Sequence, residues 1–416
     1  MLFAYRITIN LIILFSPIIF FIRLLKKKED PKRFKEKFCF FTKKRRKGKL
    51  IWFHGASVGE ILSVVPLIQE LEKDKSVHSI LVTSNTLSSS KIINTIGFKK
   101  TIHQFFPIDN LFFVKKFLKY WSPTLAIFID SEIWPHMLIN IKKESIPLVL
   151  LNGRINKKSF RKWARLGSTA KNLFSKFDLC LPSSNETKKH LKLLGAKNIK
   201  YIGNLKFTES KSNTSILNEY SKKFFLSKRI WCASSTHDVE ENICAKTHII
   251  LKKKYKNILT IIIPRHINRV PRIINELEEL NLKVHLHSSG DKIHNNTDIY
   301  LVDAYGKTKM FFSICNIVFL GGSLIGHGGQ NPLEAARYNC RILHGPNIWN
   351  FSEIYSLLKR LNVSQRVLNK EQFGKKISNL LDDKGNKKNI QSKLNLLSKK
   401  ILKLTLIELN YQIIKQ

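Results

Sequence analysis

The sequence predicts an α/β fold with two doubly wound parallel sheets, preceded by an N-terminal hydrophobic segment. From Leu50 onward, short and continuously apolar runs alternate with segments of helical periodicity. Such runs are typical of parallel strands that helices cover on both faces. The pattern breaks over residues 206–228, which form a polar linker, and then starts again. We therefore expect two Rossmann-like domains that face a cleft, with ligands at the carboxyl ends of their strands.

The N-terminal segment, residues 7–22, is almost wholly apolar and is followed at once by a Lys/Arg-rich stretch. Its 16 residues are slightly fewer than a membrane-spanning helix needs. No small-residue cleavage site precedes the basic stretch, so a signal peptide fits poorly. The basic flank argues that the rest of the chain stays in the cytoplasm. We expect a membrane anchor over residues 1–27 that spans the bilayer or lies in its interface. The alternative is an ordinary buried first helix.

The apolar runs divide the rest of the chain into domains. The strands expected in the first series are residues 50–56, 79–85, 125–130, 147–153 and 178–184. Those expected in the second series are residues 229–237, 258–266, 282–290, 299–306, 316–323 and 340–346. The predicted first domain covers residues 28–210 and the second covers 211–395. Residues 396–416 form a Lys-rich amphipathic helix that packs back on the fold or lies on a membrane.

The composition limits the classes of partner. The chain has 72 Lys+Arg against 30 Asp+Glu, a net charge of +42, which attracts polyanions such as anionic lipid or phosphorylated substrates. The lysines are spread throughout, as on a solvated surface, so we expect no nucleic-acid partner. The six cysteines form no C-x-x-C pair and the histidines show no H-E-x-x-H spacing. We therefore expect buried thiols and no metal site.

The stretch "HGASVGE", residues 54–60, joins the first expected strand to a helix. Ser57 and Glu60 have the spacing of a capping box, in which each side chain satisfies a backbone N–H of the other. A helix N-terminus lowers the pKa of Glu60, whereas a nearby carboxylate raises it again. Glu60 is therefore a candidate general base, and a purely structural cap is the alternative.

Further polar residues follow other strands of the first domain. Asp130 and Glu132 come directly after the run that ends at Ile129, so they lie near the same sheet edge as Glu60. Arg154 and Lys206 could meet an anionic donor or acceptor sugar. Ordinary surface charge is the alternative for both.

The second domain contains a glycine-rich loop, Gly321–Gly329, between a strand and a helix. We expect Asn331 as the N-cap, Pro332 at the first helical position and Glu334 at the third. Such a loop lets the backbone approach a ligand, and a helix N-terminus favours a phosphate. Glu334 could accept hydrogen bonds from ribose hydroxyls. The spacing is neither Walker A nor G-x-G-x-x-G, and a structural turn is the alternative.

Polar groups also follow three other strands of the second domain. Arg265 and His266 could grip a phosphate. Ser235, Thr236 and His237 are expected at the start of a helix, as a second anion-binding nest. The backbone of Tyr305 and Gly306 lies beside Lys307. Each is weak alone, but together they favour an anion site at one sheet edge.

These stretches resemble the 3-deoxy-D-manno-octulosonic acid (Kdo) transferases of lipopolysaccharide synthesis. The resemblance covers nearly the whole chain and is carried by "HGASVGE", "SEIWP", "GNLKF", "SSTHDVEE", "PRH" and "GGSLIGHGGQNPLEAA". It implies a GT-B glycosyltransferase fold, a metal-independent and cofactor-free reaction, and residence at the inner membrane with the catalytic domains facing the cytoplasm. The implied reaction moves Kdo from CMP-Kdo to the lipid A precursor, lipid IVA, with inversion. The first domain would bind the acceptor and the second the CMP-sugar.

The resemblance also implies roles for individual residues. Glu60 matches the base that deprotonates the acceptor hydroxyl. Glu132 and Lys206 match positions that support the transition state. The residues that match CMP contacts are Pro264, Arg265, Tyr305, Gly306, Lys307, Asn331, Pro332, Leu333 and Glu334.

Three departures from the family pattern concern neighbouring positions. Tyr305-Gly306-Lys307 stands where Met-Gly-Glu is usual, Gln330 replaces a common His, and Asp130 replaces a common Glu. Other classes stay open: a GT-B enzyme that uses a UDP-sugar or another CMP-sugar, or an inactive, basic, membrane-tethered binding protein. No residue pattern encodes the number of Kdo units added, the acceptor's finer structure or the oligomeric state.

Overall fold

The computed structural model describes residues 2–208, 217–383 and 390–414. The chain folds into two compact units. Unit 1 contains Met1–Ser210 and Leu397–Gln416, and unit 2 contains Lys211–Leu396. Much of the predicted linker, residues 209–216, lies outside the described residues. On either side of that stretch, the described parts of the linker form η2 (Leu205–Thr208) and α10 (Glu219–Leu226).

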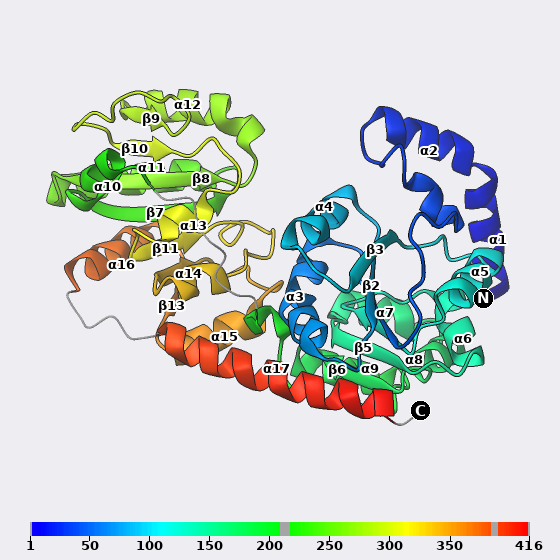
Figure 1. Cartoon of the computed structure of the whole chain (residues 1–416). Helices are drawn as coiled ribbons and strands as arrows, with labels where there is room; N and C mark the ends of the chain where they lie inside the picture. The colour runs from blue at the N-terminus through cyan, green and yellow to red at the C-terminus, as the bar shows by residue number, and fades with distance from the viewer. Residues whose placement is uncertain (1, 209–216, 384–389, 415–416) are drawn as a thin grey trace. The chain divides into compact units, whose positions relative to one another are not determined.

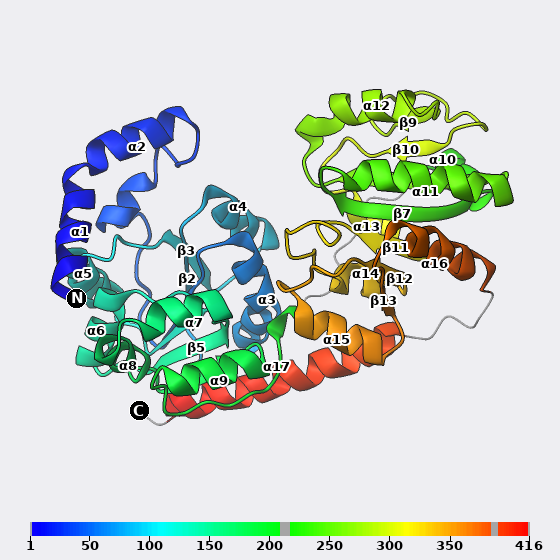
Figure 2. The same ribbon diagram turned by 180° about the vertical axis from the view of Figure 1, so that it is seen from behind.

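Unit 1 is built on a parallel sheet with helices around it (Figures 1 and 2). The six strands of this sheet lie in the order β3-β2-β1-β4-β5-β6. Its strands are β1 (Leu50–His54), β2 (Ser79–Ser84), β3 (Thr101–Phe105), β4 (Leu125–Ile129), β5 (Leu148–Gly153) and β6 (Leu179–Pro182). All of them except β3 are buried at every position, as the continuous apolar runs predict. The sequence prediction missed β3, because this edge strand reads "TIHQF" and contains no apolar run.

Helices surround the sheet of unit 1. They are α3 (Val58–Lys73), α4 (Leu87–Ile96), α5 (Leu111–Trp121), α6 (Pro135–Lys143), α7 (Lys157–Ala164), α8 (Ser168–Phe174) and α9 (Asn185–Leu193), with η1 (Phe34–Phe38) before the sheet. Several start at a side-chain cap: Ser57, Thr86, Asn110, Asn156 and Ser184 each accept a backbone N–H of the first turn. The core between sheet and helices is rich in aromatic residues, with Trp52, Phe117 and Trp121 fully buried.

Unit 2 contains a seven-stranded parallel sheet in the order β13-β12-β11-β7-β8-β10-β9. Its strands are β7 (Arg229–Thr236), β8 (Ile258–Pro264), β9 (Val284–Leu286), β10 (Ile299–Leu301), β11 (Ile317–Leu320), β12 (Arg341–His344) and β13 (Ser364–Arg366). Its other elements are α11 (Glu240–Lys254), η3 (Ile267–Arg269), α12 (Val270–Glu278), α13 (Thr308–Phe312), α14 (Leu333–Arg337), α15 (Ser352–Arg360) and α16 (Lys370–Asp382). The prediction missed β13, a three-residue edge strand of sequence "SQR".

The chain ends in a long helix, α17 (Ile390–Ile414), which starts six residues before the predicted segment 396–416. Its residues from Leu397 on belong to unit 1. There Ile401 and Leu409 are buried, and Lys200 forms an ion pair of 2.8 Å with Glu408. The apolar stripe of this part therefore packs back on the fold, which is the first of the two predicted alternatives.

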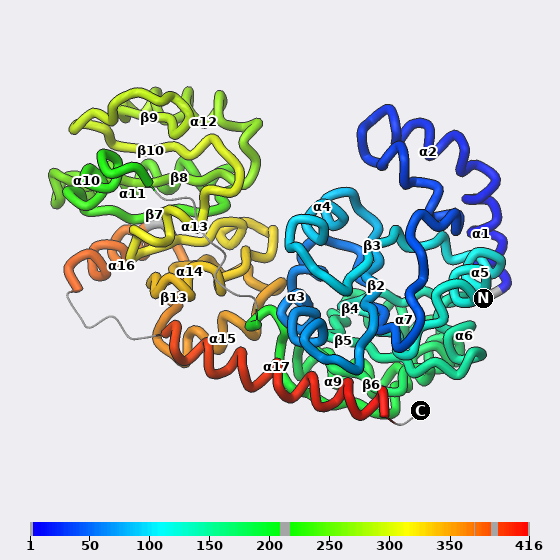
Figure 3. Tube along the Cα trace, viewed as in Figure 1, coloured from blue at the N-terminus to red at the C-terminus, as the bar shows by residue number. Residues whose placement is uncertain are grey.

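The N-terminal segment forms two helices, α1 (Leu2–Leu14) and α2 (Ser16–Leu25), at the blue end of the trace in Figure 3. Among the described residues, no single helix has the length and hydropathy of a membrane span. The pair passes that test together, but its helices bend by 56°. Both helices contact the rest of unit 1. The Tyr5 hydroxyl donates to the buried Asp109 at 2.7 Å, and the Phe20 ring packs against Phe34 and Phe38.

The outward faces of α1 and α2 are strongly apolar. Their exposed side chains are Phe3, Ile7, Leu11, Ile12, Leu14, Phe15, Ile18, Ile19, Phe21, Ile22 and Leu25. Isolated apolar residues are common on protein surfaces, but these two helices expose apolar side chains along most of their length. The alternative of an ordinary buried first helix is therefore wrong.

Candidate active site

The carboxylates predicted in the first domain gather where the strand order of unit 1 reverses. β1 and β4 are hydrogen-bonded neighbours, although two strands separate them in the sequence. The crevice beyond the carboxyl ends of such a pair is the usual ligand site of a doubly wound sheet. Glu60 follows β1, and Asp130 and Glu132 follow β4. The topology therefore brings all three to one crevice.

Glu60 lies in the first turn of α3 and takes part in the cap. Oγ of Ser57 accepts the Glu60 N–H at 3.4 Å and donates to Oε1 of Glu60 at 2.6 Å. Oε2 of Glu60 accepts the N–H of Ala56 at 2.7 Å. The predicted capping box is thus present in a shifted form, because the carboxylate reaches back to Ala56 instead of Ser57. The cap fixes the orientation of the Glu60 side chain.

The environment raises the pKa of Glu60 to about 7. Burial is the largest cause, and the charges of Glu132 and Asp130 add to it, while the hydrogen bonds from Ser57 and Ala56 act in the opposite direction. Sequence reasoning anticipated the effect of Glu132 but not that of burial. A carboxylate with a pKa near neutrality is suited to general base catalysis, because it is available ionised and still binds a proton well.

Glu132 is held in place by two ring nitrogens. Its Oε2 lies 3.1 Å from Nε2 of His54 and accepts the indole N–H of Trp134 at 2.8 Å. Burial by itself would raise the pKa of Glu132, but the bonds from His54 and Trp134 hold it below the ordinary value. Glu132 is therefore a fixed negative charge next to Glu60. The role of His54 was not predicted, although it opens the "HGASVGE" stretch.

Asp130 links the basic residues predicted for the first domain to this crevice. Burial raises its pKa, and the charges of Arg154 and Lys206 act against that rise. Both cations therefore lie close enough to Asp130 to act on it. Arg154 follows β5, the next strand of the sheet, and Lys206 lies in η2. The structure thus groups Arg154 and Lys206 with Asp130.

The polar groups predicted in the second domain follow four adjacent strands of unit 2. These strands lie in the order β11-β7-β8-β10. The glycine-rich loop follows β11, His237 follows β7, Arg265 follows β8 and Tyr305 follows β10. Pro264 is the last residue of β8, and the backbone N–H of Arg265 donates to the carbonyl of Thr236 at 3.0 Å. The parallel sheet places all of these groups at one edge.

The backbone of the glycine-rich loop donates hydrogen bonds to a buried carboxylate. Glu240 is fully buried at the start of α11, and its carboxylate accepts four backbone N–H groups at 2.7–3.1 Å. The donors are His237, Gly322, Ser323 and Leu324. Burial raises the pKa of Glu240, and these four bonds oppose the rise. Three N–H groups of the predicted phosphate loop are therefore occupied by Glu240, which sequence reasoning missed.

Two predicted helix starts in unit 2 are wrong in detail. α14 begins at Leu333, so Pro332 is the N-cap and Glu334 is the second helical residue; Asn331 lies one position earlier and accepts the Leu333 N–H with Oδ1 at 3.1 Å. Ser235 and Thr236 belong to β7, and the helix after them starts only at Glu240. With five residues, α14 is a short helix with a weak dipole, so the binding of a phosphate there would depend mainly on side chains.

His237 lies among other basic side chains. Its ring centroid is 4.2 Å from that of His327 and 5.8 Å from that of His266. The pKa of His237 is lowered to about 4, mainly by burial and in addition by the charges of His327, His266, Arg265 and Arg269. These basic side chains follow β7, β8 and β11, and Arg265 among them carries a permanent positive charge.

The second predicted CMP segment is open to solvent. Tyr305 is 64% exposed, and Gly306 has a φ of 78°, which favours glycine. Lys307 is the N-cap of α13. The side chain of Tyr305 is therefore available to a ligand and is not part of the core.

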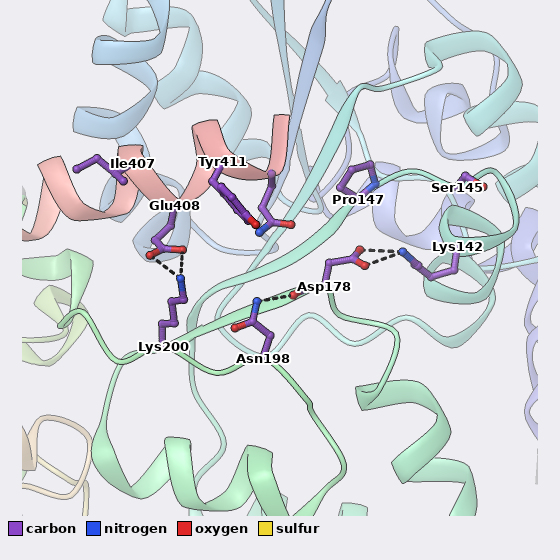
Figure 4. A pocket seen from close by; sticks show the side chains of 10 residues that line it. Lys142, Ser145, Pro147, Asp178, Asn198, Lys200, Ile407, Glu408 and Tyr411 are labelled. Carbon is purple, nitrogen blue, oxygen red and sulfur yellow. Dashed lines mark hydrogen bonds and ion pairs between the residues drawn. The ribbon is translucent and has the colours of Figure 1, made fainter. Parts of the chain in front are cut away.

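A cavity of about 530 Å³ lies elsewhere in unit 1, between α17 and the amino ends of β5 and β6 (Figure 4). Its charged side chains are paired: Lys142 with Asp178, and Lys200 with Glu408, both at 2.8 Å. It lies at the opposite end of the sheet from Glu60 and contains none of the predicted site residues. We therefore do not assign the active site to it. Within the described part of the chain, no three His, Cys, Asp or Glu residues form a group able to hold a metal ion.

Comparison with known proteins identifies the family of this chain. Residues 32–209 match the family described as 3-deoxy-D-manno-octulosonic-acid transferase (kdotransferase). A 3-deoxy-D-manno-octulosonic acid transferase of Rickettsia bellii is 34% identical over 370 residues, which cover 88% of this chain and 87% of the relative. The chain belongs to the Kdo transferase family. The Haemophilus influenzae transferase of the same name is 29% identical over 313 residues, 74% of this chain and 73% of the relative.

The solved structures confirm the predicted fold class of this Kdo transferase family member. A UDP-N-acetylglucosamine 2-epimerase superposes with a TM-score of 0.60 over 89% of this chain and 97% of its own, at 13% identity. At that identity the likeness concerns the fold alone. The chain has the two Rossmann-like α/β domains of the GT-B type, together with N-terminal helices.

Proposed function

We propose that this glycosyltransferase moves Kdo from CMP-Kdo to a hydroxyl group of lipid IVA, with Glu60 as the general base. The main support is the pKa of Glu60, which burial and two neighbouring carboxylates raise to about 7. Membership of the Kdo transferase family supports the sugar, and the cationic strand ends of unit 2 suit a donor with a single phosphate. In this proposal the reaction needs no metal or cofactor, because Arg265 stabilises the charge that develops on the CMP phosphate.

The residues divide between the two substrates. On the acceptor side, Glu60 takes the proton of the attacking hydroxyl, while Glu132 and Lys206 stabilise the transition state. On the donor side, Pro264 and Arg265 hold CMP together with the segments Tyr305–Lys307 and Asn331–Glu334. The new glycosidic bond forms as the bond from the anomeric carbon to the phosphate breaks, and inversion follows from this single displacement.

Replacement of Arg265 by Ala is expected to weaken CMP binding. Loss of one charge-assisted hydrogen bond corresponds to a roughly ten- to hundredfold rise in Kd. Arg272→Ala is the matched control, because Arg272 is exposed on α12 and pairs with Glu276. Isothermal titration with CMP and with UDP measures the effect. Equal affinity of Arg265→Ala and the wild type, or binding of UDP in preference to CMP, would contradict the assigned donor.

For the location, we propose that α1 and α2 lie in the interface of the inner membrane, on its cytoplasmic side. Their exposed apolar faces are followed by Lys26, Lys27 and Lys28, which suit anionic headgroups. The bend of 56° and the bond from Tyr5 to Asp109 in unit 1 favour an interfacial over a spanning arrangement. This position brings the acceptor crevice to the leaflet that contains the lipid substrate.

The double variant Ile18→Asp/Phe21→Asp is therefore expected to lose binding to vesicles that contain phosphatidylglycerol. Both side chains are more than half exposed, so the fold tolerates the change, whereas two buried charges in the interface oppose insertion. Leu226→Asp on α10 is the control, since Leu226 is equally exposed in unit 2. Co-flotation on a density gradient measures binding. Flotation of the double variant at the wild-type level would exclude these helices as the anchor.

A further inference from the structure

A chain of buried hydrogen bonds connects Glu132, which follows β4, to side chains of β1 and β2. Nε2 of His54 faces Oε2 of Glu132 at 3.1 Å, and Nδ1 of His54 lies 3.0 Å from Oγ1 of Thr83. Oγ1 of Thr83 also accepts the indole N–H of Trp52 at 2.9 Å. His54, Thr83 and Trp52 are all fully buried, so each polar atom in the chain needs a partner within the protein.

The chemical groups at the two ends of this chain indicate which atom donates and which accepts in each of its hydrogen bonds. An indole nitrogen only donates, and an ionised carboxylate only accepts. Since Glu132 accepts, Nε2 of His54 carries its proton, and Nδ1 of a neutral imidazole is then an acceptor. Oγ1 of Thr83 receives the proton of Trp52 on a lone pair, and its own proton has two acceptors within reach, Nδ1 of His54 at 3.0 Å and the backbone carbonyl of Phe53 at 3.4 Å. The shorter contact favours donation to Nδ1. Every polar atom of the chain is satisfied in this arrangement.

We propose that the Thr83 hydroxyl is a positioning group for the transfer reaction: by donating to Nδ1 of His54, it keeps the imidazole proton on Nε2 and so keeps Glu132 ionised beside Glu60. This inference rests on the proposed role of Glu60 as the base. Without the hydroxyl, Nδ1 takes the proton and donates to the backbone carbonyl of Thr83, which lies 3.3 Å away. Nε2 then presents a lone pair to Glu132, and the carboxylate binds a proton to relieve the repulsion.

A change in the charge of Glu132 changes the pKa of Glu60. The groups that act on Glu60 are Glu132 and Asp130 together with its hydrogen-bond donors Ser57 and Ala56. Those that act on Glu132 are His54 and Trp134, and on Asp130 they are Arg154, Lys206, Ser131 and Glu132. Loss of the Glu132 charge removes one of the two anions that raise the pKa of Glu60, so that pKa falls. A base with a lower pKa is ionised at lower pH.

The test is the pH profile of kcat for the full-length protein with CMP-Kdo and lipid IVA. The acid limb of this profile is the part at low pH where kcat rises as Glu60 ionises. We expect Thr83→Val to move this limb to lower pH by roughly 0.5–1 unit. Thr83→Ser should return it to its position in the wild-type protein. Ser84→Ala is the matched control, because Ser84 bonds another buried histidine, His103, at 2.9 Å on the same strand. Its limb is expected at the wild-type position. A Thr83→Val limb that coincides with the wild type would overturn the proposal.

A second measurement does not depend on how well Thr83→Val folds. Long-range ¹H–¹⁵N spectra of the wild-type protein with ¹⁵N-labelled histidine report which ring nitrogen of His54 carries the proton. The His54 signal is assigned as the one that is absent from the spectrum of the His54→Gln variant. We expect a proton on Nε2 alone, and a proton on Nδ1 would overturn the proposal. A Glu60→Gln variant that keeps the wild-type rate refutes the proposed base instead. If that variant is inactive and the Thr83→Val limb does not move, the positioning role alone fails.

Discussion

Replacement of Glu60 by Gln is expected to lower kcat by about 10²–10⁴-fold, the usual contribution of a general base. Gln keeps the shape of Glu and can still accept the Ala56 N–H, but it cannot take a proton from the acceptor hydroxyl. The wild-type rate should rise with pH through about 7, the pKa to which burial and the neighbouring carboxylates raise Glu60. Transfer of Kdo to lipid IVA in detergent measures the rate, and titration with CMP should give an unchanged affinity.

The control for this variant lies on the same helix. Glu70 is partly exposed on α3, where it pairs with Lys73, so Glu70→Gln should retain both rate and stability. If Glu60→Gln lowers only the melting temperature and retains the rate, Glu60 is a structural cap and the base lies elsewhere.

Replacement of Glu240 by Gln is expected to destabilise the protein by roughly 2–6 kcal/mol, because two buried N–H groups lose their acceptor at about 1–3 kcal/mol each. Each carboxylate oxygen of Glu240 accepts two backbone N–H groups, so the NH₂ group of Gln would face two donors. The glycine-rich loop would lose its attachment to the start of α11, and CMP affinity should fall with the stability. Urea unfolding measures the free energy, and CMP titration of the folded variant measures binding.

The control for Glu240 is Glu276→Gln on α12. Glu276 forms a surface pair with Arg272, and such pairs contribute about 0–1 kcal/mol. Equal unfolding free energies for Glu240→Gln and Glu276→Gln would mean that the four backbone bonds do not hold the loop.

The sequence predicted most of the fold because its parallel strands are buried and therefore continuously apolar. The two strands that it missed, β3 and β13, lie at sheet edges and have no apolar run. The candidate site residues were predicted in segments that follow an apolar run, where Glu60, Glu132 and Arg265 lie. Six isolated cysteines were predicted as buried thiols, and all six are free and buried.

The remaining parts of the site depend on contacts between segments that are distant in sequence. Glu240 was missed because its partners Gly322–Leu324 lie some eighty residues further on, and nothing local marks it as the ligand of that loop. His54 was missed because its function depends on β2 and β4, which flank β1 only in the folded sheet. Burial, the largest cause of the raised Glu60 pKa, is likewise a property of the packed crevice and not of the capping sequence.

Mass spectrometry of the lipid product tests the central claim most directly. The purified full-length protein is incubated with CMP-Kdo and lipid IVA in detergent, with Glu60→Gln as the parallel reaction. We expect lipid IVA to gain the mass of one or more Kdo residues as CMP is released, and to stay unchanged with the variant. Lipid IVA of unchanged mass in the presence of wild-type protein that binds CMP would contradict the account.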